Sequence, residues 1–352
     1  MGNITKKSRH ARIMLWSVAV ILCGSLILPL TGYVYVGLMG TTHAQSQEET
    51  NPRSDFWGAV RKSQEGYVSS SGPYTTNTLI QNGGQNWRQY RNGPVSTYGP
   101  WVLAVSLLAI GLFHLVTMGG VKLDDERSGK TVQRWSVFER YLHWFTAVLF
   151  IVLTITGLSM LFGRAVLIPV MGSTGFAAWA QVAMTLHNYL GPFFVVGVLL
   201  EILIWIRHNI PNATDFKWFA KGGGWFGKGH PSAGRMNGGE KLWFWIICTF
   251  GVAVCVTGLV LDFPNFGFTR EDMQLANLIH AVAGLVWVAV AFGHIYIGTA
   301  GTEGSLEGMT TGRVSVEWAK QHHDLWYEEV KNTAEDTSRD EAPAGKTQTT
   351  TS

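Results

Sequence analysis

Residues 275–298 read LANLIHAVAGLVWVAVAFGHIYIG, an apolar stretch that contains two histidines, His280 and His294. About 20 mostly apolar residues suffice for a helix to cross a bilayer, so this stretch can span one. The two histidines stand 14 positions apart. On a helix this places them about 21 Å apart along the axis and within about 40° of each other around it. Both imidazoles therefore share one face of a single spanning helix, one near each end.

The composition of the whole chain is that of a membrane protein. Of 352 residues, 47% are hydrophobic and only 14% are charged, whereas soluble domains carry about 25% charged residues. The net charge of +3 is too small to indicate nucleic-acid binding. Cys23, Cys248 and Cys255 form no C-x-x-C pair, so the chain offers no iron–sulfur or structural zinc site of its own.

Six stretches are long and apolar enough to span a membrane. They are approximately residues 13–39, 100–119, 141–162, 180–206, 242–261 and 275–298. We expect helices throughout, because backbone that faces lipid must satisfy its hydrogen bonds within the segment. Lys and Arg concentrate between the second and third stretches and between the fourth and fifth. These basic loops and the C-terminus are therefore expected in the cytoplasm, and residues 45–97 outside.

Four histidines in these stretches are each followed four positions later by a small residue. The pairs are His143/Ala147, His187/Gly191, His280/Gly284 and His294/Gly298. Positions i and i+4 share a helix face, so each imidazole lies beside a gap where a flat ring could rest against backbone. A single membrane histidine can instead serve as a hydrogen-bonding contact between helices. Four such pairs favour two haem groups, each with two histidine ligands on its iron.

The depth of each histidine determines its partner. His187 lies early in a span that enters from outside, and His143 lies at the start of a span that leaves the cytoplasm. Depth therefore pairs His187 with His280 for an outer haem, and His143 with His294 for an inner one. Both axial positions of each iron are then filled, so electron transfer is the expected function.

The ends of the chain suggest a division into segments. Basic residues precede the first apolar run, and Thr42-His43-Ala44 resembles a cleavage site, so residues 1–44 are a signal peptide or an uncleaved anchor. The further segments are a polar periplasmic arm (45–97), an extra transmembrane helix (98–120), a four-helix core (135–300) and a cytoplasmic C-terminal tail (301–352).

Other features receive structural interpretations. Thr156-Gly157-Leu158 and Thr257-Gly258-Leu259 echo each other late in two outward-running spans, and we interpret them as close helix packing through small residues. His114 lacks a partner at its depth and is expected to contact a neighbouring helix. His322 and His323 lie beyond the last span, where we expect a soluble contact surface.

Several stretches from Trp135 to Val330 resemble the cytochrome b (gamma) subunit of membrane-bound respiratory formate dehydrogenases, in its long form with an N-terminal extension. They are Glu139-Arg140-Tyr141-Leu142-His143-Trp144, His208-Asn209-Ile210-Pro211, Asn237-Gly238-Gly239-Glu240-Lys241, Leu278-Ile279-His280-Ala281-Val282-Ala283-Gly284, Gly304-Ser305-Leu306-Glu307-Gly308-Met309 and Trp318-Ala319-Lys320-Gln321-His322-His323. The resemblance implies an all-α membrane protein of the bacterial inner membrane: a four-helix dihaem cytochrome b bundle plus one extra helix.

The resemblance also implies partners and a direction of electron flow. An iron–sulfur beta subunit and a molybdenum- or tungsten-pterin alpha subunit would oxidise formate, so this chain itself would not catalyse that step. Electrons would enter at the outer haem, pass to the inner haem and reduce a quinone near the cytoplasmic face.

The resemblance places the quinone site at Asn237, Gly239 and Glu240, with His294 nearby. Asparagine offers donors and acceptors to a quinone carbonyl, and glycine lets the ring approach the backbone. The short form often has glutamine where this chain has Glu240, whose carboxyl could deliver a proton to reduced quinone. Asn237 and Glu240 could instead merely cap the start of the helix.

Two other functions remain open at this stage. The same type of cytochrome could serve a nickel–iron hydrogenase or another periplasmic oxidoreductase. A chain without haem, acting as a membrane scaffold or transporter, would contain the same spans but no iron.

Overall fold

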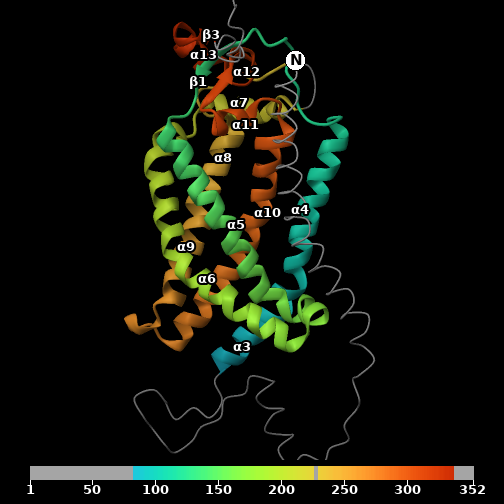
Figure 1. The fold of residues 1–352 in the computed structure, drawn as a ribbon, viewed down its shortest axis with the longest axis vertical. Helices are drawn as coiled ribbons and strands as arrows, with labels where there is room; N and C mark the ends of the chain where they lie inside the picture. Colours follow the sequence, from blue (N-terminus) through green and yellow to red (C-terminus); the bar gives the residue numbers. More distant parts are fainter. Residues whose placement is uncertain (1–81, 226–228, 337–352) are drawn as a thin grey trace, which may run out of the picture. The chain divides into compact units, whose positions relative to one another are not determined.

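A computed structural model describes residues 82–225 and 229–336 of the chain (Figure 1). Within them, five helices are long and apolar enough to cross a membrane: Asn86–Val116, Val137–Val166, Ile168–His208, Gly238–Asp262 and Arg270–Gly301. These confirm the five predicted spans that fall in this part of the chain. The predicted signal peptide or anchor and the first span lie outside the described residues, as does most of the periplasmic arm.

The spans consist of helices joined by local irregularities. Their regular parts are α4 (Ser96–Val116), α5 (Val137–Val166), α6 (Ile168–Trp205), α8 (Gly238–Ile246), α9 (Val252–Asp262) and α10 (Arg270–Tyr296). A π-helical turn, Ile247–Gly251, joins α8 to α9. Near the start of α6, Gly172 has a φ of 72°, which glycine tolerates and which kinks the helix.

The described part of the arm is helical where we expected an extended or partly ordered segment. Helix α3 (Asn82–Tyr90) and a π-helical turn (Arg91–Val95) lead directly into α4. The Nε1 atom of Trp87 donates a hydrogen bond of 3.0 Å to Oδ1 of Asn277 at the start of α10. This tertiary contact, which local sequence does not encode, helps to order the end of the arm.

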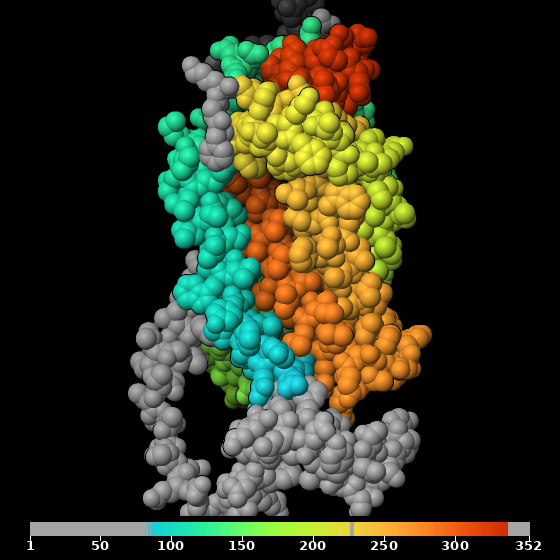
Figure 2. Space-filling view, turned by 180° about the vertical axis from the view of Figure 1, so that it is seen from behind, coloured from blue at the N-terminus to red at the C-terminus, as the bar shows by residue number. Residues whose placement is uncertain are grey.

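The described residues form two compact units. Unit 1 comprises residues 82–108, 146–198 and 247–292, and its interior is apolar and aromatic. Gly99 of α4 lies against Leu285 of α10, and Ser106 donates to the carbonyl of Ala289. Figure 2 shows α4, in cyan, beside α10, in orange. The extra transmembrane helix therefore packs on the helix that carries two of the four histidines.

Unit 2 comprises residues 109–145, 199–225, 229–246 and 293–336. It contains a three-stranded antiparallel sheet in the order β2 (Arg313–Ser315), β1 (Lys130–Gln133), β3 (Glu335–Asp336). Around the sheet lie α7 (Ala213–Ala220), α11 (Ser305–Thr310), α12 (Val316–His322) and α13 (Asp324–Val330). Residues 301–336, which we expected as the first part of a tail, are therefore folded.

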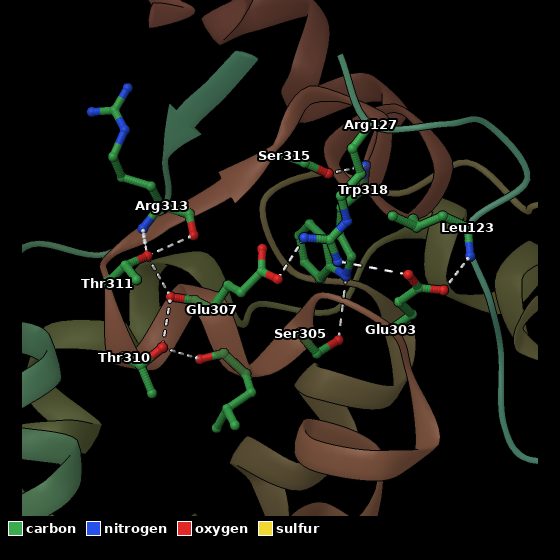
Figure 3. A network of polar contacts seen from close by, with 11 residues as sticks. Leu123, Arg127, Glu303, Ser305, Glu307, Thr310, Thr311, Arg313, Ser315 and Trp318 are labelled. Atoms are coloured by element: carbon green, nitrogen blue, oxygen red, sulfur yellow. Dashed lines mark hydrogen bonds and ion pairs between the residues drawn. The ribbon is translucent and has the colours of Figure 1, made fainter. Parts of the chain in front are cut away.

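Unit 2 has its own hydrophobic core and a polar network beside it. The core consists of Val132, Val314, Val316, Trp318, Ala319 and Trp326. Figure 3 shows the network, in which Nη1 of Arg127 lies 2.6 Å from Oε1 of Glu307 and Nε1 of Trp318 donates to Oγ of Ser305. Ser315 caps α12 by accepting from the backbone nitrogen of Trp318. These contacts hold α11 and α12 against the segment before β1.

Candidate haem-binding site

The two histidines predicted for the outer haem, His187 of α6 and His280 of α10, face each other in unit 1. Their ring centres lie 6.0 Å apart with an interplanar angle of 74°. An imidazole nitrogen binds a metal at about 2.0–2.1 Å, and the ring centre lies roughly 1 Å further back, so two rings on opposite sides of one metal have centres roughly 6 Å apart. The spacing therefore fits a single iron between the two rings.

A threonine hydroxyl orients each ring of this pair. The Nδ1 atom of His187 lies 2.9 Å from Oγ1 of Thr156, and Nδ1 of His280 lies 3.1 Å from Oγ1 of Thr257. Each hydroxyl donates its own proton to a backbone carbonyl one turn earlier, so Oγ1 can accept from Nδ1–H. The proton is thereby held on Nδ1, and the lone pair of Nε2 remains available to a metal.

A glycine beside each threonine makes room for the ring. A Cβ atom added at Gly157 would lie 3.2 Å from Cε1 of His187, and one at Gly258 would lie 3.2 Å from Cε1 of His280. Each Thr-Gly pair therefore supports one histidine by a hydrogen bond and by close approach of the backbone. In the sequence the two triplets were interpreted as helix packing. Their repetition was the available signal for this role, and it was missed.

The two histidines predicted for the inner haem, His143 of α5 and His294 of α10, face each other in unit 2. Their ring centres lie 6.2 Å apart at an angle of 56°. Within the described chain, the buried Nδ1 of His143 has no hydrogen-bond partner. The indole of Trp243, on α8, stacks on His294 with ring centres 4.4 Å apart and an interplanar angle of 8°. This pair also has the spacing of two ligands on one iron.

Open space beside the histidines is present at two of the three glycines that follow them by four positions. A Cβ added at Gly284 or Gly298 would meet no described atom within 4 Å, apart from nearby backbone of its own helix. At Gly191, by contrast, Oδ2 of Asp262 lies 3.4 Å from such a Cβ. The paired rings, the available Nε2 atoms of the outer pair and this free space together fit haem.

Three aromatic rings pack together in unit 1, and each stands at the same sequence spacing from a histidine. The ring centre of Trp287 lies 5.1 Å from that of Phe150 and 5.5 Å from that of Phe194. Each of the three stands seven positions along its own helix from a histidine, and Trp287 stands seven from both His280 and His294. Seven positions are about two helical turns, so the spacing was visible in the sequence.

The residues proposed for quinone binding lie at the start of α8. Oδ1 of Asn237 accepts a 2.9 Å hydrogen bond from the backbone nitrogen of Glu240, and Oε2 of Glu240 accepts one of 2.9 Å from the backbone nitrogen of Asn237. These reciprocal hydrogen bonds form a capping box at the start of α8. Among the described residues nothing engages Nδ2 of Asn237, which therefore remains able to donate to a ligand. Trp243, one turn further along α8, provides the contact with His294.

Glu240 is also half of an ion pair. Its Oε1 lies 2.7 Å from Nη2 of Arg134, which is 3% exposed. The guanidinium lies over the rings of Trp135, Trp318 and Trp326 at 4.8–5.3 Å from their centres. Burial lowers the pKa of Arg134, and the neighbouring Glu240 opposes that shift. The structure thus connects the start of α8 to the core of unit 2.

The structure also tests the predictions for His114 and His323, which are not among the four paired histidines. His114 contacts a neighbouring helix, as expected, because its Nδ1 lies 2.9 Å from the hydroxyl of Tyr296 on α10. The prediction of a soluble contact surface is wrong for His323, which is 0% exposed and packs against Trp318 and Trp326. Hydrophobic packing of the segment after the last span, which has no helical periodicity long enough to detect, buries this ring.

Spanning apolar helices that bring two pairs of histidines to the spacing of iron ligands define a membrane cytochrome of the b type. Residues 134–312, about half the chain, match the family described as prokaryotic cytochrome b561, and the chain belongs to that family. Membership implies haem b, a multi-pass membrane protein and an all-α fold.

Curated relatives confirm the resemblance to formate dehydrogenase subunits. The cytochrome b556(Fdn) subunit of nitrate-inducible formate dehydrogenase from Escherichia coli K12 is 29% identical over 212 residues, which cover 57% of this chain and 93% of the relative. The cytochrome b556(fdo) subunit of formate dehydrogenase from the same strain is 31% identical over 210 residues, which cover 58% of this chain and 96% of the relative. The formate dehydrogenase cytochrome b556 subunit of Haemophilus influenzae is 31% identical over 198 residues, which cover 54% of this chain and 79% of the relative.

Replacing Thr257 with valine is expected to weaken the binding of haem. In Thr257→Val, His280 loses one acceptor for Nδ1–H but retains the carbonyl of Val254, 3.1 Å away. We therefore expect about tenfold weaker haem retention, the low end of the effect of losing a metal ligand's hydrogen-bond partner. Transfer of haem to added apomyoglobin measures it. Thr299→Val is the matched control, because that hydroxyl bonds only to backbone; equal retention in both variants would contradict the role of Thr257.

Proposed function

We propose that this chain is the haem b membrane subunit of a formate dehydrogenase, which receives electrons from an iron–sulfur subunit and passes them through two haems to membrane quinone. The two histidine pairs, 6.0 and 6.2 Å between ring centres, are the main support, since each can provide both axial ligands of one iron. The names of the relatives support the choice of formate dehydrogenase. When bound, the haems would supply the one-electron carriers.

The protein's own residues would hold and insulate these carriers. His187 with His280, and His143 with His294, would each hold one haem iron through two imidazoles, an arrangement that suits electron transfer and not oxygen or substrate binding. Thr156 and Thr257 keep the outer imidazoles in the tautomer that a metal requires. We further propose that the membrane is the bacterial inner membrane, that residues 45–97 are periplasmic and that the C-terminus is cytoplasmic, because Lys and Arg concentrate in the loops on that side.

Purification of the tagged full-length chain from its native membrane tests this function. We expect a reduced b-type absorption spectrum with two haems per chain, together with an iron–sulfur subunit and a pterin-containing subunit. Formate should reduce the haems, and an added quinone should reoxidise them. Reduction by hydrogen and not by formate would favour a hydrogenase instead. Colourless protein, after expression with ample porphyrin, would contradict a haem protein of any kind.

The start of α8 is proposed as the quinone site, with Asn237, Gly239 and Glu240. Its support is the free Nδ2 of Asn237 and the contact of Trp243 with His294, which brings this end of α8 to the inner histidine pair. Gly239 lies against Trp218, whose ring would be 3.1 Å from an added Cβ, so the backbone there is packed closely on one side. An acceptor held here could hydrogen-bond to Asn237 while electrons arrive from the inner pair.

The charge of Glu240 is expected to matter for quinone reduction. Glu240→Gln keeps the capping box, because glutamine suits that position, but removes the carboxylate. We expect quinone reduction to slow by about 100-fold at alkaline pH, the low end of the typical contribution of one proton-transferring group. Steady-state quinone reduction between pH 6 and 9 measures this. Glu307→Gln, an exposed glutamate paired with Arg127, is the control. An unchanged rate and pH dependence in Glu240→Gln would show that the carboxylate has no role in proton delivery.

A further inference from the structure

A row of titratable side chains in unit 2 begins at the surface. The carboxylate of Asp124 is 77% exposed, and its Oδ2 lies 3.0 Å from Nε2 of His230. The ring of His230, in turn, has its centre 5.8 Å from that of His322, the last residue of α12. Imidazoles at this distance can exchange a proton directly or through one water molecule. The three residues come from separate segments and were not connected in the sequence.

His322 is the buried member of this row. Its Nε2 is buried and has no hydrogen-bond partner within the described chain. Burial lowers its pKa to about 4, with His230 and Arg134 lowering it as well and Glu240 and Asp124 opposing them. At neutral pH the ring is therefore uncharged, with one nitrogen protonated and one free. A neutral imidazole of this kind can accept a proton on one nitrogen and release another from the opposite nitrogen.

The row ends at the proposed quinone site. His322 and the guanidinium of Arg134, which pairs with Glu240, both lie against Trp318: the ring centre of His322 is 5.4 Å from that of Trp318, and Cζ of Arg134 is 4.8 Å from it. His323, the adjacent residue, has its Nδ1 2.8 Å from the carbonyl of Gly234 and its Nε2 3.7 Å from Oε2 of Glu240. Because His323 is fully buried between Trp318 and Trp326, it forms the wall of this region and has no access to solvent. His322, which contacts His230, is the member that connects the surface to Glu240.

We propose that Asp124, His230 and His322 form a relay that carries protons from the aqueous surface to the quinone site at the start of α8. This inference rests on the proposed function, since it requires a quinone beside Asn237 and Glu240. Asp124 attracts protons to His230, His230 passes one to His322, and His322 releases one toward the quinone. Glu240, whose Oε1 lies 2.7 Å from Nη2 of Arg134, would stabilise the positive charge while it resides on His322.

The electrons and protons of quinone reduction are all accounted for. Reduction of one quinone requires two electrons, which a haem held by the inner histidine pair would supply one at a time, and two protons, which the relay would supply; two O–H bonds form to give the quinol. Each histidine returns to its initial protonation state after a proton has passed. The relay is therefore not consumed, and it needs no reactant other than quinone, electrons and solvent protons.

Three variants test the relay in membranes that contain the full-length chain. His322→Gln and Asp124→Asn interrupt it. Asp125→Asn is the matched control, because Asp125 is an exposed carboxylate one position away that forms no ion pair with His230 among the described residues. The haems are reduced with just enough dithionite, and their reoxidation by decylubiquinone or, in a parallel arm, by menadione is followed by stopped flow from pH 6 to 9. The solvent deuterium isotope effect is measured at each pH.

We expect Asp125→Asn to match the wild type. We expect His322→Gln to reoxidise at least about tenfold more slowly at pH 8, with a steeper pH dependence, a larger isotope effect and an unchanged haem spectrum. Asp124→Asn should show a smaller loss of the same kind. Wild-type rates, pH dependence and isotope effect in His322→Gln would overturn the relay. Failure of wild-type haems to be reoxidised by either quinone would instead contradict the proposed function.

A further variant, His230→Ala, distinguishes loss of proton transfer from loss of folding. His230 is only 26% exposed at its side chain, yet it lies beside exposed Asp124, so a small base can reach its position. We expect His230→Ala to be slow and to recover at least half of the wild-type rate when imidazole is added, whereas His322→Gln should not recover. A merely structural role for His230 predicts no recovery, and that result would also overturn the relay.

Discussion

Replacing His280 with leucine is expected to remove one haem of two and to leave the other in place. His280 faces His187 with ring centres 6.0 Å apart, and loss of one axial ligand from a buried bis-histidine site leaves the iron without its second bond to the protein. The ring centres of the other pair, His143 and His294, lie 6.2 Å apart, and this pair is expected to hold the second haem without His280. A pyridine haemochrome assay on purified protein should show the haem content per chain reduced by half.

The control for this variant is His114→Leu. His114 also lies in a spanning helix, but its Nδ1 is engaged with the hydroxyl of Tyr296, 2.9 Å away. This variant should retain both haems. His280→Leu with two haems, or with none while His294 and His143 remain intact, would contradict the pairing of the four histidines. His187→Leu should behave as His280→Leu does, since both belong to the same pair.

Replacing Arg134 with leucine is expected to destabilise unit 2 by about 1.5–3 kcal/mol, the typical contribution of a hydrogen bond between charged groups, because Glu240, which loses its partner, is 34% exposed. Arg134 is 3% exposed, lies 2.7 Å from Glu240 and touches three tryptophans. Leucine would restore some apolar packing but would leave the Glu240 carboxylate without its partner. Thermal unfolding in detergent, followed by tryptophan fluorescence, measures the loss, because five tryptophans of unit 2 are buried.

Arg127→Leu provides the comparison within the same unit. Arg127 also forms an ion pair, 2.6 Å from Glu307, but both side chains are about 40% exposed. Exposed pairs contribute about 0–1 kcal/mol, so this variant should unfold close to the wild-type temperature. Equal shifts for the two arginines would show that burial of the Arg134–Glu240 pair does not contribute to stability.

The membrane architecture and the histidine pairing could be predicted from the sequence because both depend on local properties. An apolar run of sufficient length determines a span, and a spacing of 14 along one helix determines that His280 and His294 share a face. Depth then selects the partners, and the ring distances agree with the pairs so chosen. The β-strands of unit 2 were not predicted, because Lys130–Gln133 is a short strand without a long alternating pattern.

The repeated Thr-Gly pairs were predicted to mark close helix packing, which the structure shows, but their contacts with the histidines were not predicted. The repeated Thr-Gly pairs at Thr156 and Thr257 stand 31 and 23 residues from the histidines that they contact. Nothing in the local pattern indicates which ring a threonine will meet across a helix interface. The same limit applied to Glu240, whose partner Arg134 lies 106 residues away.

The sequence by itself determined that the chain crosses a membrane with helices, which four histidines lie within them and how those histidines pair. Only the tertiary structure decided which hydroxyls orient the outer rings, how the segment after the last span folds, and that Asp124, His230 and His322 lie in one row. The physical reason is that hydropathy and helical period act over a few turns, whereas these contacts join segments that are separate in sequence, from Thr257 and His280 at a separation of 23 to Asp124 and His230 at a separation of 106. Their register depends on how side chains fill space between helices, which no single segment specifies.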